Sequence, residues 1–248
     1  MDSCILQKKR EIFMDIKERN YKEMKSAFET EGLNQGPWTS WSMMHDARHM
    51  AFVLSRYKFV AKMLEGRKRV MEVGSGDAFG LPIVAQNLCE GGVLYAVDWE
   101  SEFLDDNRKR LPFLNNVKFI HHDMNEKALK DVNVSAIYLI DVIEHVDPVK
   151  EDVFMRNMVA SYENKEDAVM IIGTPNQTAA EYASVQSKAV HINLKGQDSL
   201  KALLRKYFHN TFLFGMNDEV VHTGFAPMCH YIWGIGAGLK EQQPLTGE

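Results

Sequence analysis

Cysteine is scarce in this chain of 248 residues, which contains Cys4, Cys89 and Cys229 only. The three lie far apart and form no CxxC pair, so neither a disulfide framework nor a structural zinc site is predicted. Such sparse cysteine is typical of a reducing compartment. We therefore expect a cytoplasmic protein.

The chain also lacks an excess of positive charge. Its 29 Lys and Arg residues are outnumbered by 34 Asp and Glu residues, which gives a formal net charge of −5. A protein dedicated to DNA or RNA needs a dense basic surface to displace phosphate counterions. We therefore expect no nucleic-acid partner.

Long apolar runs are absent as well. Residues 1–20 carry charges every few positions and have no apolar core of the kind a secretory signal needs. The late apolar stretch at 231–239 is too short and too rich in glycine to cross a bilayer. We expect no membrane association. Hydrophobic residues, at 45%, still suffice for a sizeable core, and the length suits one α/β domain with small additions.

The N-terminal part of the chain differs in pattern from the rest. Residues 1–31 have the mixed charge of a solvated helix, and a second helical stretch is predicted at about 43–64. The loop between them contains Trp38 and Trp41. Because this region has too few apolar residues for a core of its own, residues 1–56 are predicted to dock on the remainder as a helical lid.

From residue 69 onward, short runs rich in Val and Ile alternate with helical segments. The runs are too continuously apolar for half-exposed strands and predict buried parallel strands, at 69–74, 93–98, 117–123, 134–141 and 168–174. The helical segments between and after them are expected at 79–89, 101–110, 150–162, 179–187 and 197–207.

Two last runs, at 211–216 and 230–236, are expected to form an antiparallel hairpin at the sheet edge. The predicted fold class is therefore α/β, with a doubly wound, mostly parallel seven-stranded sheet. This domain is expected to occupy residues 57–239, between the N-terminal helical extension and a flexible tail at 240–248.

A glycine-rich loop, Gly74-Ser75-Gly76-Asp77-Ala78-Phe79-Gly80, directly follows the first strand. Glycines at a strand-to-helix turn let a ligand approach the backbone, at the sheet edge where open α/β folds bind ligands. The third glycine falls one residue late for the dinucleotide motif GxGxxG, and the Gly-Lys-Ser/Thr ending of a P-loop is missing. The loop therefore indicates another nucleotide-type ligand.

Carboxylates accompany this loop. Glu72 stands just before it, Asp98 ends the second strand, where such folds bind ribose hydroxyls, and Asp123 follows the third strand. A carboxylate-rich pocket repels pyrophosphate and suits a ligand with a positive charge and no phosphate. S-adenosylmethionine (SAM) meets this description.

In these motifs the chain resembles the class I SAM-dependent methyltransferases, over about residues 57–236. The resemblance implies that the motif at 72–76 holds the methionine part of SAM, that Asp98 binds the ribose and that Trp99 packs on the adenine. Asp123 and Met124 match the adenine-contacting position, and Asp141 matches a position that faces cofactor and acceptor. Tyr57 is either a further cofactor contact or ordinary core. The predicted cofactor-binding residues are Tyr57, Glu72, Gly74, Gly76, Asp98, Trp99, Asp123, Met124 and Asp141. The spacing of Gly80 departs from the shortest form of the motif.

Two later blocks, residues 141–146 (DVIEHV) and 173–176 (GTPN), are similar to a subgroup that includes ubiquinone-biosynthesis O-methyltransferases and many small-molecule and glycan methyltransferases. This similarity implies methyl transfer to an oxygen, of a hydroxyl or carboxylate, on a small molecule or glycan precursor, with residues 1–56 as an acceptor wall. A hydroxyl acceptor needs a proton acceptor, and His145 and His191 are the predicted catalytic residues.

Several alternatives remain open at this stage. Asp141, Glu144, His145 and His191 would also suit a divalent cation, as in some members of the subgroup, although a metal-free histidine base oriented by Glu144 is favoured. Methylation could instead occur on nitrogen or carbon. Two rival functions remain: an NAD-dependent oxidoreductase, and a non-catalytic cofactor-binding partner in a biosynthetic complex. The acceptor's identity and the oligomeric state follow from no pattern in the sequence.

Overall fold

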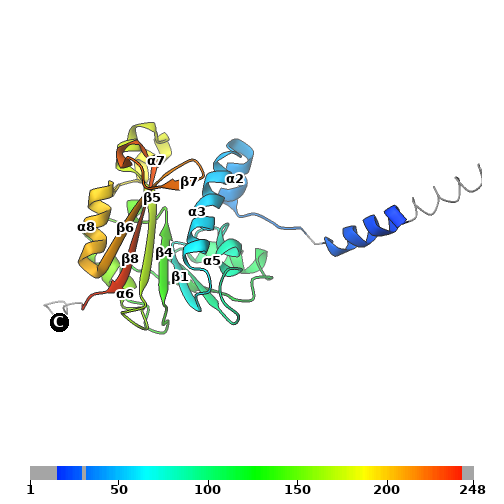
Figure 1. Ribbon diagram of the computed structural model, residues 1–248, viewed down its shortest axis with the longest axis horizontal. Helices are drawn as coiled ribbons and strands as arrows, with labels where there is room; N and C mark the ends of the chain where they lie inside the picture. Colours follow the sequence, from blue (N-terminus) through cyan, green and yellow to red (C-terminus); the bar gives the residue numbers. More distant parts are fainter. Residues whose placement is uncertain (1–15, 30–31, 242–248) are drawn as a thin grey trace, which may run out of the picture. The chain divides into compact units, whose positions relative to one another are not determined.

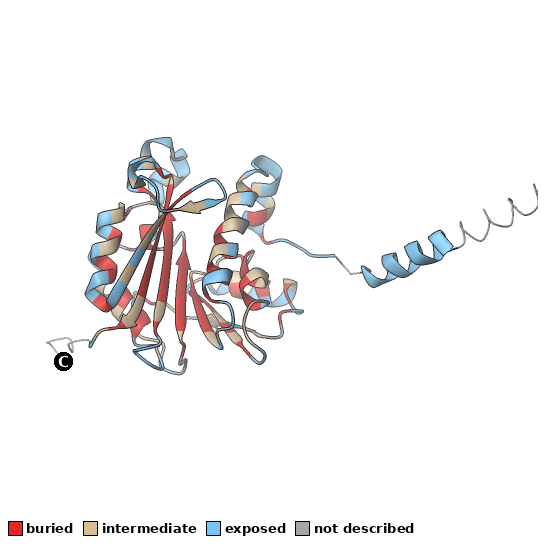
Figure 2. Ribbon diagram, in the orientation of Figure 1, coloured by how far each residue is buried: buried red, intermediate tan, exposed pale blue. Residues whose placement is uncertain are grey.

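The computed structural model describes residues 16–29 and 32–241, and the chain divides into two compact units, Met1–Asn34 and Gln35–Glu248 (Figure 1). In the first unit, residues 16–27 are helical and every described side chain from 16 to 29 is exposed (Figure 2). This confirms part of the solvated helix predicted at 1–31. Residues 1–15 and 30–31, and the predicted tail from residue 242 onward, lie outside the described residues.

The second unit is built on one sheet. Its described part has eight strands in the order β3-β2-β1-β4-β5-β8-β6-β7. The first five strands are parallel, β8 is antiparallel to both β5 and β6, and β7 is antiparallel to β6. The strands are β1 Arg69–Val73, β2 Val93–Asp98, β3 Val117–His121, β4 Ala136–Ile140, β5 Val169–Pro175, β6 Phe208–Asn217, β7 Val220–His222 and β8 Tyr231–Leu239. The predicted doubly wound, mostly parallel sheet is confirmed.

Two details of the predicted sheet are wrong. The sheet has eight strands and not seven, because a tight turn, in which Asp218 has a φ of 51°, folds the three-residue β7 back onto β6. The two last predicted strands do pair with each other, but they are not a hairpin at the edge. β8 lies between β5 and β6 and pairs with both.

Helices cover both faces of the sheet (Figure 1). The segments predicted at 101–110 and 197–207 are confirmed residue for residue, whereas the stretch predicted at 43–64 begins earlier, with Pro37 in the first turn, and is divided in two. The helices are α2 Pro37–His45, α3 His49–Met63, α4 Leu81–Ala85, α5 Ser101–Arg110, α6 Glu151–Val159, α7 Val185–Val190 and α8 Gln197–Tyr207, with 3-10 turns η1 Ile143–His145, η2 Gln177–Tyr182 and η3 Ala226–Met228.

Strand β4 shows why the apolar runs are continuous. All five of its residues are buried, and successive side chains of a strand point to opposite faces. Ile137 and Leu139 join the core under α6 and α8, whereas Tyr138 joins the core under α3 and α4. A strand covered on both faces has no polar side to alternate with.

The compact unit begins at Gln35, so α2 and α3 belong to it, and the boundary predicted at residue 56 falls within α3. The Thr39 backbone N–H donates a hydrogen bond to Asp77 Oδ2 over 2.8 Å. The Trp38 ring packs edge-on against Phe103, with ring centroids 4.5 Å apart. Helix α2 is thereby attached to the glycine loop and α5. No helix in the described residues has the length and apolar character needed to cross a bilayer.

Candidate active site

The glycine loop follows β1 with a backbone that only glycine adopts easily. Gly74 has a φ of 79° and Gly76 a φ of 48°. A Cβ at Gly74 would overlap the Val142 side chain, which follows β4. Glycine at position 74 therefore allows both the left-handed turn after β1 and the close packing of Val142 against the loop.

Asp98 fixes this loop. Its side chain is 7% exposed, and its Oδ2 accepts a hydrogen bond from the Gly76 N–H over 2.8 Å. Its Oδ1 accepts one from the Glu100 N–H over 2.9 Å. Each carboxylate oxygen keeps a further lone pair, so Asp98 can still accept hydrogen bonds from a ligand's hydroxyl groups.

Glu72 and Tyr57 lie beneath the loop and line neither of the two cavities described in this section. The Tyr57 hydroxyl donates to Glu72 Oε1 over 3.0 Å, and the Tyr138 hydroxyl donates to Oε2 over 2.9 Å. Burial raises the pKa of Glu72 to about 8. Any Cβ at Gly80 would overlap the Tyr57 ring, which gives a physical reason for glycine at the position where the motif departs from its shortest form.

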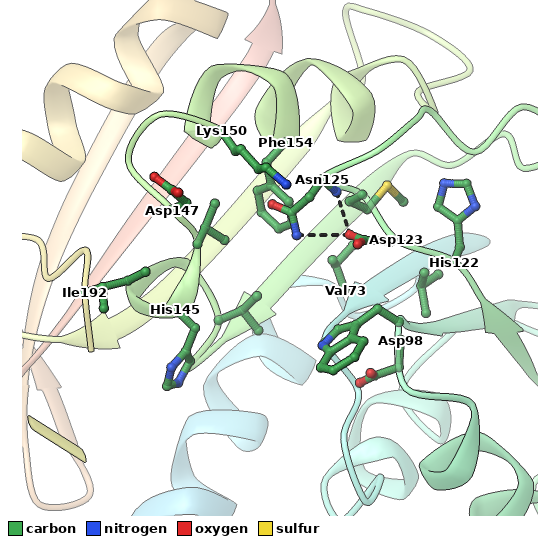
Figure 3. Close-up of a pocket in the computed structure, with 16 residues that line it drawn as sticks. Val73, Asp98, His122, Asp123, Asn125, His145, Asp147, Lys150, Phe154 and Ile192 are labelled. Carbon is green, nitrogen blue, oxygen red and sulfur yellow. Dashed lines mark hydrogen bonds between the residues drawn. The ribbon is translucent and has the colours of Figure 1, made fainter. Parts of the chain in front are cut away.

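A cavity of about 310 Å³ opens beside the loop, within the size range of small-molecule sites (Figure 3). Asp123 Oδ1 accepts hydrogen bonds from the backbone N–H and the side-chain amide of Asn125, over 2.7 and 3.0 Å (Figure 3). The Trp99 side chain is 65% exposed at the cavity, so its aromatic face is available to a base. Of the predicted site residues, the cavity is lined by Gly74, Asp98, Trp99, Asp123, Met124 and His145.

Sequence reasoning missed other residues that line this cavity. Val142 and Asn125 adjoin motif residues, and this proximity is a signal that could have found them. Lys150 and Phe154, at the start of α6, and Ile192 carry no local signal (Figure 3). The apolar wall and the carboxylates together fit the adenosine part of SAM, which has an aromatic base and ribose hydroxyls.

Asp141 faces away from this cavity and toward α3. It has a φ of 56°, which is uncommon for a residue with a side chain and typical of strained functional positions. Its Oδ2 lies 2.6 Å from Nη1 of Arg56, a buried residue that no motif in the sequence indicates. The Arg56 guanidinium also stacks over the Tyr231 ring, 4.0 Å from its centroid.

The two predicted catalytic histidines lie together. The rings of His145 and His191 have centroids 5.0 Å apart. His145 Nδ1 lies 3.1 Å from the Val190 carbonyl oxygen, which can only accept, so we assign the proton to Nδ1 and leave Nε2 free to accept a proton. Burial, followed by the neighbouring His145, lowers the pKa of His191 and favours its neutral form.

Glu144 completes this group. It is buried, its Oε2 accepts a hydrogen bond from Thr174 Oγ1 over 3.0 Å, and burial raises its pKa to about 8. One ligand atom each from Glu144, His145 and His191 lie within 4.8 Å of one another, an arrangement that could hold a metal ion. The structure thus brings together three of the four predicted residues, whereas Asp141 is paired with Arg56.

A second cavity, of about 450 Å³, lies on the other side of this histidine pair. His145 lines the first cavity and His191 lines the second. The second cavity is lined by residues of α3, of the segment that follows β5 through α7, and of the start of β8 and the residue before it. These residues include His49, Phe52, Arg56, Asn176, Tyr182, His230 and Tyr231. The histidine pair therefore connects two ligand-sized spaces.

Comparison with known proteins agrees with this geometry. Residues 71–159 match a family model described as a methyltransferase domain. No curated protein sequence matches significantly. Among solved structures, the fold is similar to that of the methyltransferase domain of bacterial CtHen1 (14% identity, TM-score 0.58, covering 75% of this chain and 99% of that one). It is also similar to that of a SAM-dependent methyltransferase from Aquifex aeolicus (16% identity, TM-score 0.57, covering 82% of this chain and 98% of that one). A third similar structure is the plantazolicin methyltransferase BpumL in complex with SAH (13% identity, TM-score 0.58, covering 80% of this chain and 88% of that one). Residues 71–159 thus match a methyltransferase domain, and the fold around them is that of known SAM-dependent methyltransferases.

Proposed function

We propose that the protein transfers the methyl group of SAM to a hydroxyl oxygen of a small molecule or glycan precursor. The observation that carries this proposal is the position of His145 and His191 between the two cavities. A hydroxyl must lose its proton as its oxygen is methylated, and a neutral imidazole is the side chain best suited to take it near pH 7. A carboxylate acceptor would need no such base.

The roles of the chain's own residues follow from their positions. SAM supplies a methyl group on a sulfonium, which is electrophilic. Gly74 and Asp98 hold the cofactor in the first cavity, Gly76 fixes Asp98 through its backbone N–H, and Trp99 packs on the base of the cofactor. Nε2 of His145, or the His191 ring, accepts the hydroxyl proton from an acceptor in the second cavity. The protein's main contribution is alignment of the reacting atoms and exclusion of water.

Helix α3 supports the assignment of the second cavity to the acceptor. His49, Phe52 and Arg56 line it from this helix, and all three fall in the segment predicted as an acceptor wall. In this proposal the predicted contact of Asp141 with cofactor and acceptor is replaced by an indirect contact with the acceptor alone, through Arg56.

The proposal is tested by turnover with candidate hydroxylated acceptors, in which mass spectrometry detects the added methyl group and NMR locates it. Substitution of His145 or His191 by alanine should lower kcat by about 10²- to 10⁴-fold, as for loss of a general base. SAM affinity should stay near wild type in His191→Ala. His209→Ala, at an exposed position on β6, is the matched control.

The same assay separates a metal-free base from a metal site. A base alone predicts turnover indifferent to a chelator, whereas a metal held by Glu144, His145 and His191 predicts loss on chelation and recovery with magnesium or zinc. Near-normal turnover in both histidine variants, or a methyl group found on nitrogen or carbon, would contradict the proposed function.

A further inference from the structure

The second cavity is lined by three histidines whose rings are available to a ligand. His49, His191 and His230 are partly buried, and their ring nitrogens make no hydrogen bond within the described residues. Burial lowers the pKa of the His49 and His230 rings, and Arg56 lowers the pKa of both further. A neutral imidazole offers one donor and one acceptor, which matches the hydrogen bonding of a hydroxyl group.

Among the described residues that line this cavity, no cation lacks a carboxylate partner. Apart from histidines, the charged residues that line it are Arg56 and Asp218. Arg56 is neutralised by Asp141 at 2.6 Å and covered by Tyr231. Asp218 is exposed on the turn between β6 and β7. An anionic group placed here would lose its hydration without gaining an opposite charge, which is costly.

Aromatic and apolar faces alternate with these polar groups. The Phe52 ring lies between two of the histidines, 5.9 Å from His49 and 6.2 Å from His230 by centroids. Pro175, Ala179 and Leu194 add apolar surface across the cavity. Flat apolar surfaces beside neutral donors and acceptors fit a ring that carries hydroxyl groups on its edge and C–H groups on its faces.

Resting on the proposed O-methylation, we propose that the second cavity binds the acceptor as an uncharged, hydroxyl-bearing ring such as a neutral sugar residue. His49 and His230 exchange hydrogen bonds with its hydroxyl groups, and Phe52 packs on its face. Phosphate, carboxylate or ammonium groups on this ring are excluded. A charged group elsewhere on a larger acceptor can remain outside the cavity.

The test is a binding experiment on the protein saturated with SAH, so that no methyl transfer is needed. Ligand-observed NMR compares matched probes in the gluco, galacto and manno series: the methyl glycoside, the uronate, the 6-phosphate and the 2-amino sugar. We expect at least one neutral glycoside to bind about tenfold or more tightly than its charged counterparts. Tighter or equal binding of a charged form, or binding of no form, would overturn the inference.

Variants locate the binding. His230→Ala and Phe52→Ala should each weaken glycoside binding about 2- to 10-fold, the loss expected for one hydrogen bond or one packing contact. SAH affinity reports whether each variant is folded. If an alanine variant does not fold, His230→Gln replaces His230→Ala and Phe52→Leu replaces Phe52→Ala. His209→Ala is the control. Unchanged glycoside binding in the variants at both His230 and Phe52 would overturn the assignment of this cavity. Failure of the proposed function would instead appear in the turnover assay, with glycoside binding intact.

Discussion

Replacement of Asp98 by alanine tests the cofactor site directly. In the folded protein this carboxylate accepts two hydrogen bonds, from the backbone N–H groups of Gly76 and Glu100, at 2.8 and 2.9 Å. Alanine would leave both donors without this acceptor. Because the cavity is open to water on one side, solvent replaces part of the loss.

The magnitude follows from these contacts. A hydrogen bond to a charged group contributes about 1.5–3 kcal/mol, so two such bonds, partly replaced by water, predict a loss of roughly 2–4 kcal/mol in the free energy of unfolding. Loss of the carboxylate's hydrogen bonds to the ribose adds a separate cost in binding, of about 1.5–3 kcal/mol. That cost corresponds to SAM affinity about 10- to 150-fold weaker.

Two assays measure these quantities apart. Urea unfolding of the cofactor-free protein gives the stability change, and calorimetry with SAM and SAH gives the affinities under conditions where the variant is folded. Asp105→Ala is the matched control, since it removes a carboxylate from an exposed ion pair with Arg108 on α5 and should change stability by only about 0–1 kcal/mol. SAM affinity within twofold of wild type in folded Asp98→Ala would refute the assignment of this residue.

Two further predictions concern the surroundings of the loop. Gly74→Ala should lose roughly 2–5 kcal/mol of stability, because its Cβ would overlap Val142 and its backbone is left-handed. Adding Val142→Ala should restore the part of this loss that is due to the overlap. Urea unfolding of wild type, the two single variants and the double variant measures this coupling, and strictly additive effects would contradict the contact. Burial raises the pKa of Glu72 from 4.5 to about 8, so its contribution to stability is present in full below pH 4.5 and is lost as pH rises through about 8, with a slope of up to about 1.4 kcal/mol per pH unit. Glu72→Gln should flatten the dependence of Tm on pH over this range relative to the exposed control Glu102→Gln, and an unchanged slope would show that Glu72 is not buried as an acid.

Elements whose local sequence and packing agree could be predicted. In α8, Leu200, Leu203, Leu204 and Tyr207 recur at helical spacing and are all buried, so its limits were clear. The segment at 177–190 has no buried residue in η2 or α7. Because this segment has no apolar face, the spacing of its apolar residues does not define the limits of a helix. Where one helix is predicted at 179–187, the structure has the 3-10 turn η2 and the short helix α7.

The residues of the candidate site also divide into those that the sequence predicts and those that only the packing of the fold brings together. Gly74, Asp98 and Asp123 occupy strand ends, where topology alone brings residues to one edge of the sheet. Arg56 reaches both Asp141, after β4, and Tyr231 only because α3 packs over the sheet and β8 enters between β5 and β6. No spacing in the sequence encodes that meeting, and the prediction of β8 at the edge pointed away from it.

Helix α3 has a role that its individual contacts do not express. Through Tyr57 it is bonded to Glu72 beneath the cofactor loop, and through the adjacent Arg56 and through Phe52 it forms a wall of the second cavity. One helix thus supports the glycine loop and lines the second cavity. Linkage between two binding sites is reciprocal: if SAM shifts this helix and changes acceptor affinity by some factor, the acceptor must change SAM affinity by that same factor. Measuring SAM affinity with and without acceptor would therefore report any coupling through α3.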